Sequence, residues 1–371
     1  MNQTDFDPNL VDLNPEFQHA LRLIAHERKS LFITGGAGTG KSTFIKYFLA
    51  TTDLKTVVLA PTGVAALAVG GQTIHSFLHF PARLIKPNDV HKLRDVTVVR
   101  SLDVLILDEA SMISANLMDA IDESLRLNRQ SPTLPFGGTQ VVLVGDLYQL
   151  SPVVTQRDRP IFDDKYGGIY FFNAPVFKEL QMGRLEFSRT YRQTDEDFLS
   201  ILNAVRVGKA SPEILEPLNA RVCEVDHLEA ADSYVILTPR NDAAHEINMQ
   251  RLDELAEPEF EYQAEVSGGF MSDKLLDPTE RTLRLKQGAR VIMLSNDREK
   301  RWVNGTLAIV EKLSKDRIVV RIGKDQWSVE PRMWQHVKYR YDHITKRITQ
   351  DVEGVFRQFP LRKRAKITSI V

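Results

Sequence analysis

At 371 residues, with 43% hydrophobic and 26% charged residues, the chain has the size and composition of a globular protein with two or three domains. It contains no apolar run of membrane length and no signal-peptide pattern, and its single cysteine, Cys223, excludes an intramolecular disulfide and a cysteine-based zinc site. We therefore expect a cytoplasmic protein without a membrane partner, or a nuclear one if the source is a eukaryote.

The net charge of −1 hides an uneven distribution of charge along the chain. Residues 280–371 hold 22 Lys and Arg against 10 Asp and Glu, a net +12, so the remainder carries a net −13. A basic segment of this kind binds a polyanion such as nucleic acid, or it forms a solvated charged surface. Charge alone leaves both interpretations open.

The first predicted element in chain order is a helix that begins near Pro15. Asn14 is a preferred N-cap residue, and proline is favoured at the first helical position. Apolar residues then recur at helical spacing, at Phe17, Ala20, Leu21 and Ile24. Gln18 falls on the opposite side of this helix, where a glutamine is usually only solvated.

The motif G-x-x-x-x-G-K-[ST] follows, between an apolar strand at 31–34 and a helical segment at 43–49. In this context glycines let consecutive backbone N–H groups surround a phosphate, and the helix N-terminus points at the same anion. Lys41 is then placed for the β- and γ-phosphates, and the Ser42 hydroxyl is placed for Mg²⁺. We predict a nucleotide site formed by Gly35, Gly36, Ala37, Gly38, Thr39, Gly40, Lys41, Ser42 and Thr43.

Short, nearly continuous apolar runs predict the buried strands of a parallel sheet, at 31–34, 56–60, 103–107 and 140–144. Polar residues follow these strands, where parallel sheets bind their ligands. Asp108 is placed to hold Mg²⁺, Glu109 to activate the attacking water, and Gln149 to sense the γ-phosphate. A small-metabolite kinase would also place an acid here, so this pattern alone leaves that function open.

Other candidate residues lie on loops near the predicted sheet. The stretches after residue 60 and around residue 73 bring small, hydroxyl and histidine side chains close to the site; for His75 alone, a hydrogen-bonded structural role is the favoured interpretation. Residues 78–100 look like a small irregular excursion. Arg192, ahead of a helix with apolar residues at helical spacing, is placed to stabilise transition-state charge, an effect worth roughly 10³–10⁵ in rate, or to form an ordinary ion pair.

A second α/β region follows the first. It has predicted strands at 234–237 and 290–294, a helix that carries Ala244 and Ile247, and a polar stretch at 257–283 that we interpret as a mobile loop. From residue 305 the pattern changes to period two, which predicts a small antiparallel barrel or sheet. Its interleaved basic and aromatic residues either stack on single-stranded nucleic acid or fill the barrel core: Arg317, Arg321, Trp334, Lys338, Tyr339 and Arg340.

Taken in order, these motifs resemble those of the Pif-type (petite integration frequency) DNA helicases of superfamily 1, the group that includes RecD-like enzymes. The resemblance covers roughly residues 13 to 362 and rests on these matching stretches: 14–18, 35–43, 60–63 with 73–77, 108–112, 135–138 with 145–150, 191–193, 304–305 and 358–361.

The resemblance implies an α/β fold with two RecA-like P-loop NTPase domains, the second one incomplete, and an SH3-like β insertion. The implied segments are a first domain at 1–185 with a wedge subdomain at 78–100, a second domain at 186–305, the insertion at 306–358 and an atypical basic tail at 359–371.

The resemblance also implies roles. Gln18 would read adenine, Lys41 and Ser42 would bind phosphate and Mg²⁺, Asp108 would hold the metal, Glu109 would activate water, Gln149 would couple hydrolysis to DNA, and Arg192 would act across the cleft. The DNA contacts carried over are Thr62, Gly63, His75, Phe77, Arg240 and Asn241. The implied function is ATP-dependent 5′-to-3′ translocation on single-stranded DNA and unwinding at a fork or junction, by a monomer, in repair, recombination or genome maintenance.

Two departures leave an alternative open. Ser151 stands where the family usually has proline, which is a minor change. After residue 361 the sequence lacks the family's later motifs. We therefore expect that the second domain lacks its last strands and that a second arginine finger is also missing. The alternative is therefore a protein that binds ATP and DNA with little or no turnover.

Overall fold

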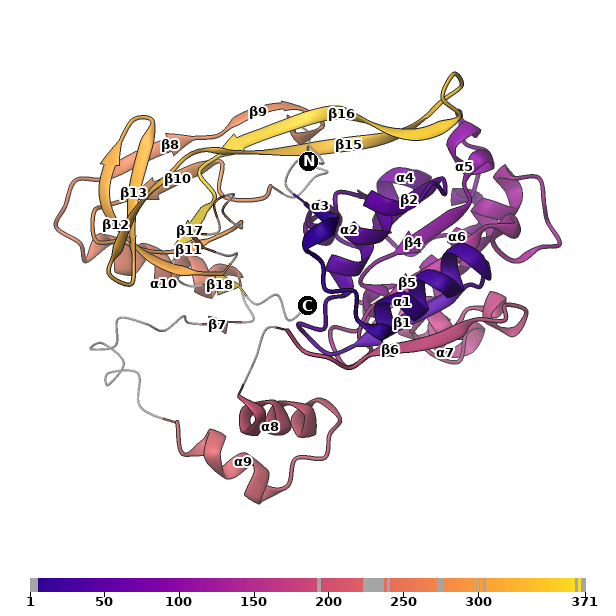
Figure 1. Ribbon diagram of the computed structural model, residues 1–371, viewed down its shortest axis with the longest axis horizontal. Helices are drawn as coiled ribbons and strands as arrows, with labels where there is room; N and C mark the ends of the chain where they lie inside the picture. The colour runs from indigo at the N-terminus through magenta and orange to yellow at the C-terminus, as the bar shows by residue number, and fades with distance from the viewer. Residues whose placement is uncertain are drawn as a thin grey trace. The chain divides into compact units, whose positions relative to one another are not determined.

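The computed structural model describes residues 6–191, 195–222, 237–238, 241–271, 277–295, 297, 299, 301–302, 305–363 and 366–367. The chain divides into two compact units, one formed by residues 1–220 with 337–352 and the other by residues 221–336 with 353–371 (Figure 1). The boundary predicted at residues 185 and 186 falls inside the first unit, which also contains part of the predicted insertion.

The first unit is built on a six-stranded sheet in the order β3-β2-β4-β5-β1-β6, in which every neighbouring pair is parallel. The strands are β1 (Leu31–Gly35), β2 (Thr56–Ala60), β3 (Gln72–Thr73), β4 (Val104–Leu107), β5 (Gln140–Val144) and β6 (Gly183–Phe187). The four predicted strands are thus confirmed, whereas β3 and β6 were not predicted. The carboxyl ends of β4, β5 and β1 are neighbours, which brings their following loops to one edge.

The helices of this unit are α1 (Pro15–Leu21), α2 (Lys41–Thr51), α3 (Gly63–Val69), α4 (Ile74–Leu78), α5 (Thr97–Ser101), α6 (Ala115–Asn128), α7 (Arg159–Lys165), α8 (Glu196–Arg206) and α9 (Pro212–Asn219). A π-helical turn, Arg22–His26, extends α1, and 3₁₀ turns occupy Pro8–Leu10, Pro87–Asp89, Ala110–Met112, Pro135–Gly138, Phe171–Asn173 and Pro175–Lys178.

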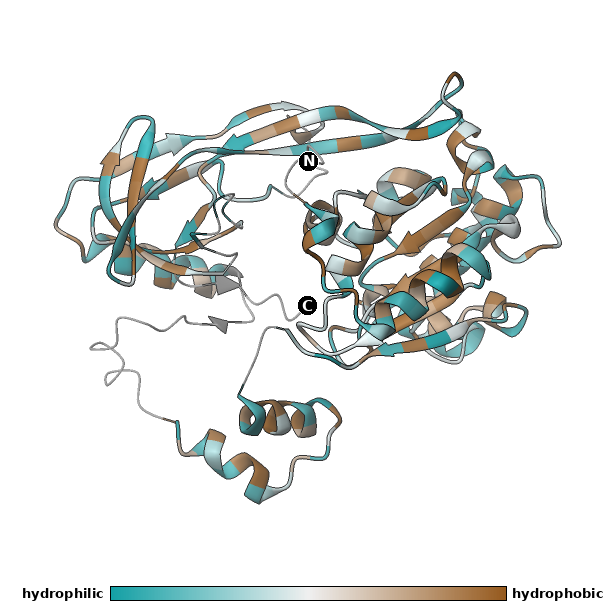
Figure 2. Cartoon of the chain, viewed as in Figure 1, coloured by the Kyte–Doolittle hydropathy of each residue, from teal (hydrophilic) through white to brown (hydrophobic). Residues whose placement is uncertain are grey.

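Two apolar clusters hold the sheet and helices together. One contains Phe17, Ile33 and Phe44, and the other contains Leu105 and Phe136. Adjacent residues of β4 fall in opposite clusters, as expected for a strand covered on both faces, and the strand is almost uniformly hydrophobic (Figure 2). The continuous apolar runs of the sequence therefore reflect a sheet buried on both sides.

The N-terminal helix forms as the sequence predicts. The Asn14 side chain accepts a hydrogen bond from the backbone N–H of Phe17 at 2.8 Å, which caps α1. Phe17 and Ala20 are buried, and the Phe17 ring packs edge-on against Phe44, with a centroid distance of 5.4 Å. This cap therefore fixes the helix that covers the start of α2.

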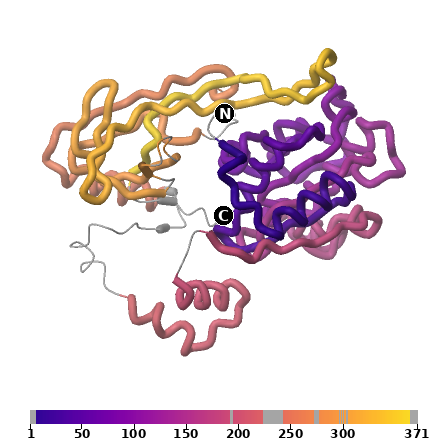
Figure 3. Tube along the Cα trace, viewed as in Figure 1, coloured from indigo at the N-terminus to yellow at the C-terminus, as the bar shows by residue number. Residues whose placement is uncertain are grey.

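The tip of a long hairpin, β15 (Arg332–Asp342) and β16 (Arg347–Gln358), completes the first unit (Figure 3). The buried Tyr339 hydroxyl accepts from the Val58 N–H at 3.1 Å and donates to the Val58 carbonyl at 3.3 Å. Its ring packs edge-on against Phe77, at a centroid distance of 6.0 Å. The predicted alternatives for Tyr339 were stacking on nucleic acid or filling the barrel core, whereas it packs in the core of the first unit.

The second unit consists mainly of antiparallel sheets. A five-stranded sheet runs β14-β13-β12-β11-β17, and smaller ones pair β10 with β8 and β16 with β9. The strands are β8 (Phe260–Gln263), β9 (Glu265–Gly268), β10 (Thr282–Leu285), β11 (Arg290–Met293), β12 (Leu307–Ser314), β13 (Arg317–Ile322), β14 (Asp325–Val329) and β17 (Leu361–Lys363), beside helix α10 (Asn241–Asp253) and a 3₁₀ turn, Gly269–Met271.

The strand predicted at 290–294, the helix around Ala244 and the period-two strands are confirmed. Among the described residues, the parallel pairing expected in this region is seen where β7 (Leu237–Thr238) pairs with β18 (Lys366–Ile367). The rest of the strand predicted at 234–237 lies outside the described residues. The predicted basic tail holds β17, which pairs with β11, so this segment is part of the sheet.

The interpretation of residues 257–283 as a mobile loop is wrong, because β8, β9 and the start of β10 lie there. These strands are short and mostly polar, so their sequence carries little signal of its own. They form because β8 pairs with β10 and β9 pairs with β16, and because Tyr262 packs against Phe359 at a centroid distance of 4.9 Å. Pairing across the chain, rather than local pattern, decides their structure.

No helix in the part of the chain that the structure describes is long and apolar enough to span a membrane.

Candidate functional site

The phosphate-binding loop connects β1 to α2 with the geometry that its glycines allow. Gly35 and Gly40 have φ of 153° and 87°, and a Cβ on Gly35 would overlap the Phe187 carbonyl oxygen. Thr39 donates its hydroxyl hydrogen to the Gly36 carbonyl at 3.0 Å, which braces the loop. Helix α2 begins at Lys41, so its first backbone N–H groups face the loop, as an anion site requires.

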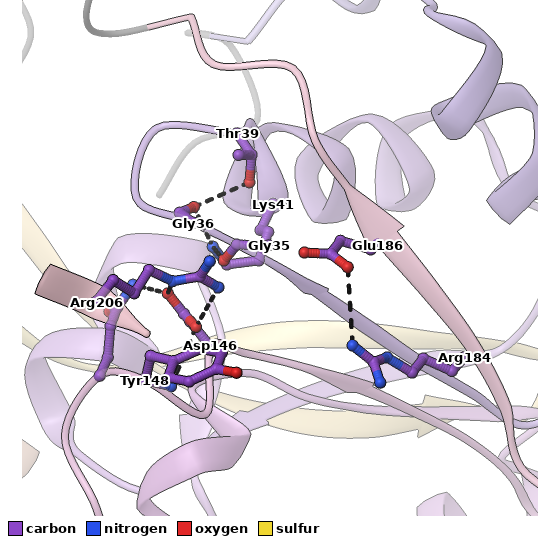
Figure 4. Close-up of polar contacts among 10 residues, drawn as sticks. Gly35, Gly36, Thr39, Lys41, Asp146, Tyr148, Arg184, Glu186 and Arg206 are labelled. Carbon is purple, nitrogen blue, oxygen red and sulfur yellow. Dashed lines mark hydrogen bonds and ion pairs between the residues drawn. The ribbon is translucent and has the colours of Figure 1, made fainter. Parts of the chain in front are cut away.

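Lys41 lies folded against the loop that it follows. Its Nζ donates to the carbonyl oxygens of Gly35 and Gly36, both at 2.8 Å (Figure 4). Burial lowers the pKa of Lys41, and the charges of Asp146, Glu109 and Asp108 oppose that shift. These three acids therefore lie near enough for their charges to act on the ammonium group.

Asp108 and Glu109 follow β4 at the same edge of the sheet. Burial, assisted by the charge of Glu109, raises the pKa of Asp108 to about 6. Glu109 occupies the left-handed region, with φ of 50°, which is uncommon for a residue other than glycine, and burial raises its pKa as well. A buried acid with a raised pKa beside Lys41 has the chemistry of a cation ligand or a proton acceptor.

The turn after β5 adds a group that the sequence did not single out. Asp146 is 1% exposed, and it forms a two-pronged ion pair with Arg206 of α8, at 2.8 and 3.1 Å. Asp146 also accepts from the Gln149 side chain at 3.1 Å. The Gly-Asp stretch that ends β5 was visible in the sequence, but its partner lies 60 residues further along the chain.

The turn after β4, which carries Asp108 and Glu109, lies close to the turn after β5, which carries Asp146, and this close approach depends on Gly145. A Cβ at this position would lie 2.8 Å from the Ala110 backbone nitrogen, so a larger residue would push the turn after β5 away from the turn after β4. Gly145 also donates its N–H to the Ile33 carbonyl at 3.1 Å, which ties this turn to β1. The two turns and the phosphate loop therefore form one connected edge.

The segment that follows β6, residues 188–191, contacts both the phosphate loop and the start of the N-terminal helix, and we call it the strap. The Tyr191 N–H donates to the Gly38 carbonyl at 2.9 Å, and its hydroxyl accepts from the Asn14 side chain at 2.9 Å. The Gln18 side chain donates to the Leu13 carbonyl at 2.8 Å, in the stretch that precedes α1. The sequence did not predict this strap. Arg192, the next residue, lies outside the described part of the chain.

The predicted DNA-contacting residues of the first unit occupy two short helices beside β2 and β3. Thr62 caps α3 by accepting from the Ala65 N–H at 3.3 Å, and Gly63 is the first residue of that helix. His75 and Phe77 lie on α4, where burial lowers the pKa of His75. Arg240 lies outside the described residues, and α10 begins at Asn241.

A pocket of about 520 Å³ borders the phosphate loop within the first unit. Its walls come from the loop, the strap and α8, through Gly36, Thr39, Ser188, Thr190, Asn203 and Arg206. Among the described residues, no three His, Cys, Asp or Glu side chains converge as a metal site. A magnesium ion here would therefore depend on one or two side chains together with the nucleotide phosphates.

Comparisons with known proteins agree with this geometry. The model of a family described as PIF1-like helicase matches residues 12–214. Over 320 residues the chain is 34% identical to the ATP-dependent DNA helicase Pif1 of Bdellovibrio bacteriovorus, covering 84% of this chain and 70% of that relative. The chain belongs to the PIF1-like helicase family. It spans less than half the length of several other curated family members.

Solved structures of the PIF1-like family share the fold. A Bacteroides Pif1 in complex with ADP-AlF4 superposes with a TM-score of 0.87 at 32% identity, covering 96% of this chain and 83% of that one. A Bacteroides Pif1 bound to single-stranded DNA superposes with a TM-score of 0.62 at 33% identity, covering 96% of this chain and 82% of that one. The α/β fold with RecA-like architecture is thereby confirmed.

Proposed function

We propose that this protein is an ATP-dependent DNA helicase that couples ATP hydrolysis to 5′-to-3′ movement on single-stranded DNA and to duplex unwinding. The observation that supports this most is the convergence of the phosphate loop with Asp108, Glu109 and Asp146 at one edge of a parallel sheet. Relatives named as ATP-dependent DNA helicases support the same proposal, and repair, recombination or genome maintenance would be its setting.

The residues of this site would divide the work of ATP hydrolysis. Backbone N–H groups of 35–43 and the Lys41 ammonium would bind the phosphates, so Lys41 must leave the Gly35 and Gly36 carbonyls that it now contacts. Ser42 and Asp108 would hold Mg²⁺, which neutralises charge on the β- and γ-phosphates. Glu109 would accept the proton of the attacking water, Gln149 and Arg192 would face the γ-phosphate, and Gln18 would read adenine.

Single-stranded DNA and a fork or duplex junction are the proposed partners. The net +12 of residues 280–371 favours a polyanion, and a Bacteroides relative is bound to single-stranded DNA. The proposed contacts are Thr62, Gly63, His75, Phe77, Arg240 and Asn241. We place the protein with the DNA, in the cytoplasm of a bacterium or the nucleus of a eukaryote, and we propose that it acts as a monomer.

The proposal is tested by measuring ATP hydrolysis with and without single-stranded DNA. We expect DNA to stimulate hydrolysis, and we expect Lys41→Ala to reduce the stimulated rate by about 10² or more because its charge faces the transferred phosphate. Lys46→Ala, on the same helix, is the matched control and should retain activity. An absence of DNA stimulation would overturn the proposal. ATP and DNA binding without hydrolysis above the Glu109→Ala level would instead favour a binding protein with little turnover.

A further inference from the structure

The ion pair between Asp146 and Arg206 is more enclosed than the surface ion pairs of the first unit. The Arg206 Nη2 lies 2.8 Å from Asp146 Oδ1, and the Nε lies 3.1 Å from Oδ2, so the guanidinium binds both carboxylate oxygens (Figure 4). Asp146 is 1% exposed. By contrast, Arg159 and Asp163 of α7 form a pair in which both side chains are more than half exposed.

This pair organises the turn that carries Gln149. Besides binding Arg206, Asp146 accepts from the Tyr148 N–H at 3.2 Å and from the Gln149 side chain at 3.1 Å. The guanidinium of Arg206 also stacks over the Tyr148 ring, 4.7 Å from its centroid. Three residues of the turn are therefore held through one carboxylate and one guanidinium.

The charge of Asp146 acts on the groups around the phosphate loop. Burial lowers the pKa of Lys41 and raises the pKa of Glu109, and the charge of Asp146 opposes the first shift and adds to the second. Arg206 is a cation in direct contact with Asp146, and Arg206 itself lines the pocket beside Gly36 and Thr39. Without Arg206, the buried Asp146 carboxylate would lose its ion-pair partner next to the proposed triphosphate site.

We infer that Arg206 is a positioning residue for the phosphate site: through Asp146 it fixes the Gln149 turn and neutralises a carboxylate that would otherwise repel bound nucleotide. The inference rests on the proposed ATP hydrolysis, since it assigns a role within that site. Arg206 comes from α8, so it links this helix to the turn after β5.

A double-mutant cycle separates this role from the alternatives. Arg206→Gln leaves Asp146 buried and unpaired, so we expect the KM for ATP to rise about tenfold or more and kcat to fall. Asp146→Asn with Arg206→Gln removes both charges, so the KM should return to within about threefold of the wild-type value, while kcat stays low because asparagine has one acceptor oxygen where Asp146 uses two to hold Tyr148 and Gln149. Arg206→Lys keeps the charge but not the two-pronged geometry, and it should change kcat more than KM.

Two other outcomes would overturn the inference. If the double variant keeps the raised KM of Arg206→Gln, then Arg206 binds nucleotide directly. If the melting temperature falls while KM and kcat of the folded protein are unchanged, then the pair is only structural. Arg159→Gln, which breaks the exposed pair on α7, is the matched control and should leave both constants unchanged.

The same variants are also compared by their dissociation constants for a fluorescent ATP analogue, because this quantity does not depend on turnover. If the wild-type protein binds the analogue without hydrolysing ATP, the helicase proposal fails while the binding cycle still decides the role of Arg206. A dissociation constant that Arg206→Gln leaves unchanged would overturn the inference even in an active enzyme.

Discussion

The two units of this molecule differ in how their strands are stabilised. In the first unit, β2, β4 and β5 are continuous apolar runs that are buried along their whole length. In the second unit, β8 and β9 are mostly exposed, and Tyr262 is the buried residue among the four of β8. A strand covered on both faces can therefore be recognised in the sequence as a continuous apolar run. A strand stabilised mainly by pairing with its neighbours has no such pattern.

The difference extends to function. The first unit carries the phosphate loop and buries Asp108 and Asp146, whereas Tyr262, Phe359 and Leu361 pack in the core of the second. Buried acids cost stability unless they are paired, so the first unit has to balance its fold against its chemistry.

Matched substitutions of a buried phenylalanine in each unit should have different effects on nucleotide binding. Phe17 is 1% exposed and packs against Phe44, and a Cβ on Gly40 would lie 3.0 Å from its ring. Phe359 is 3% exposed and packs in the second unit. Each change to alanine should cost about 3–5 kcal/mol of local stability. Phe17→Ala should also weaken nucleotide binding, because the ring supports the phosphate loop.

Hydrogen exchange resolved by peptide, together with nucleotide affinity, is the measurement for this pair. Phe359→Ala should increase exchange in the second unit and leave nucleotide affinity unchanged. Equal loss of nucleotide binding in both variants would contradict the contrast between the units.

Asp108→Asn should stabilise the protein without nucleotide at neutral pH. The folded-state pKa of about 6 lies above the ordinary value of 3.8, so folding favours the protonated acid and stability falls as pH rises through the window from about 4 to 6. Above that window, ionised Asp108 costs about 3 kcal/mol, which the asparagine variant recovers. Urea unfolding at pH 4 and pH 8 should show a gain at pH 8 that vanishes at pH 4. A gain of equal size at both values would exclude this cause.

Tyr339→Phe should destabilise the first unit although residue 339 is 281 residues from its partner Val58. The change removes both hydrogen bonds to the Val58 backbone within a buried site and should cost about 1–3 kcal/mol. Tyr341→Phe, two residues further along β15, is the matched control. Increased exchange of the β2 amides in the first variant alone would confirm the effect, and similar protection in both would show that the hydroxyl contributes little.

Much of the first unit could be predicted from local pattern. The strands at 31–34, 56–60 and 140–144 follow from continuous apolar runs, and the Asn14 cap follows from side-chain chemistry at the start of a helix. The phosphate loop and the acids at 108 and 109 were identified because each follows such a strand. The roles of these residues in binding nucleotide and DNA stay predictions until the binding of both ligands to this protein is measured.

Other features depend on residues that meet only in the folded chain. Strands β8 and β9 were interpreted as a loop because their alternation is short and polar, and their partners β10 and β16 are distant in sequence. The hairpin tip was assigned to an insertion, whereas Tyr339 packs with Phe77 in the first unit. Here the stabilising contact is long-range, so no local window contains both partners.

By itself, the sequence determined the phosphate loop of residues 35–43, since glycine conformations, a lysine and a helix start are local properties of a few adjacent residues. It also determined that Asp108 and Glu109 follow a buried strand. Only the tertiary structure decided that Arg206 neutralises Asp146 and holds the Gln149 turn beside that loop. The physical reason is that a buried charge needs a partner, and the fold supplies it from a helix 60 residues away.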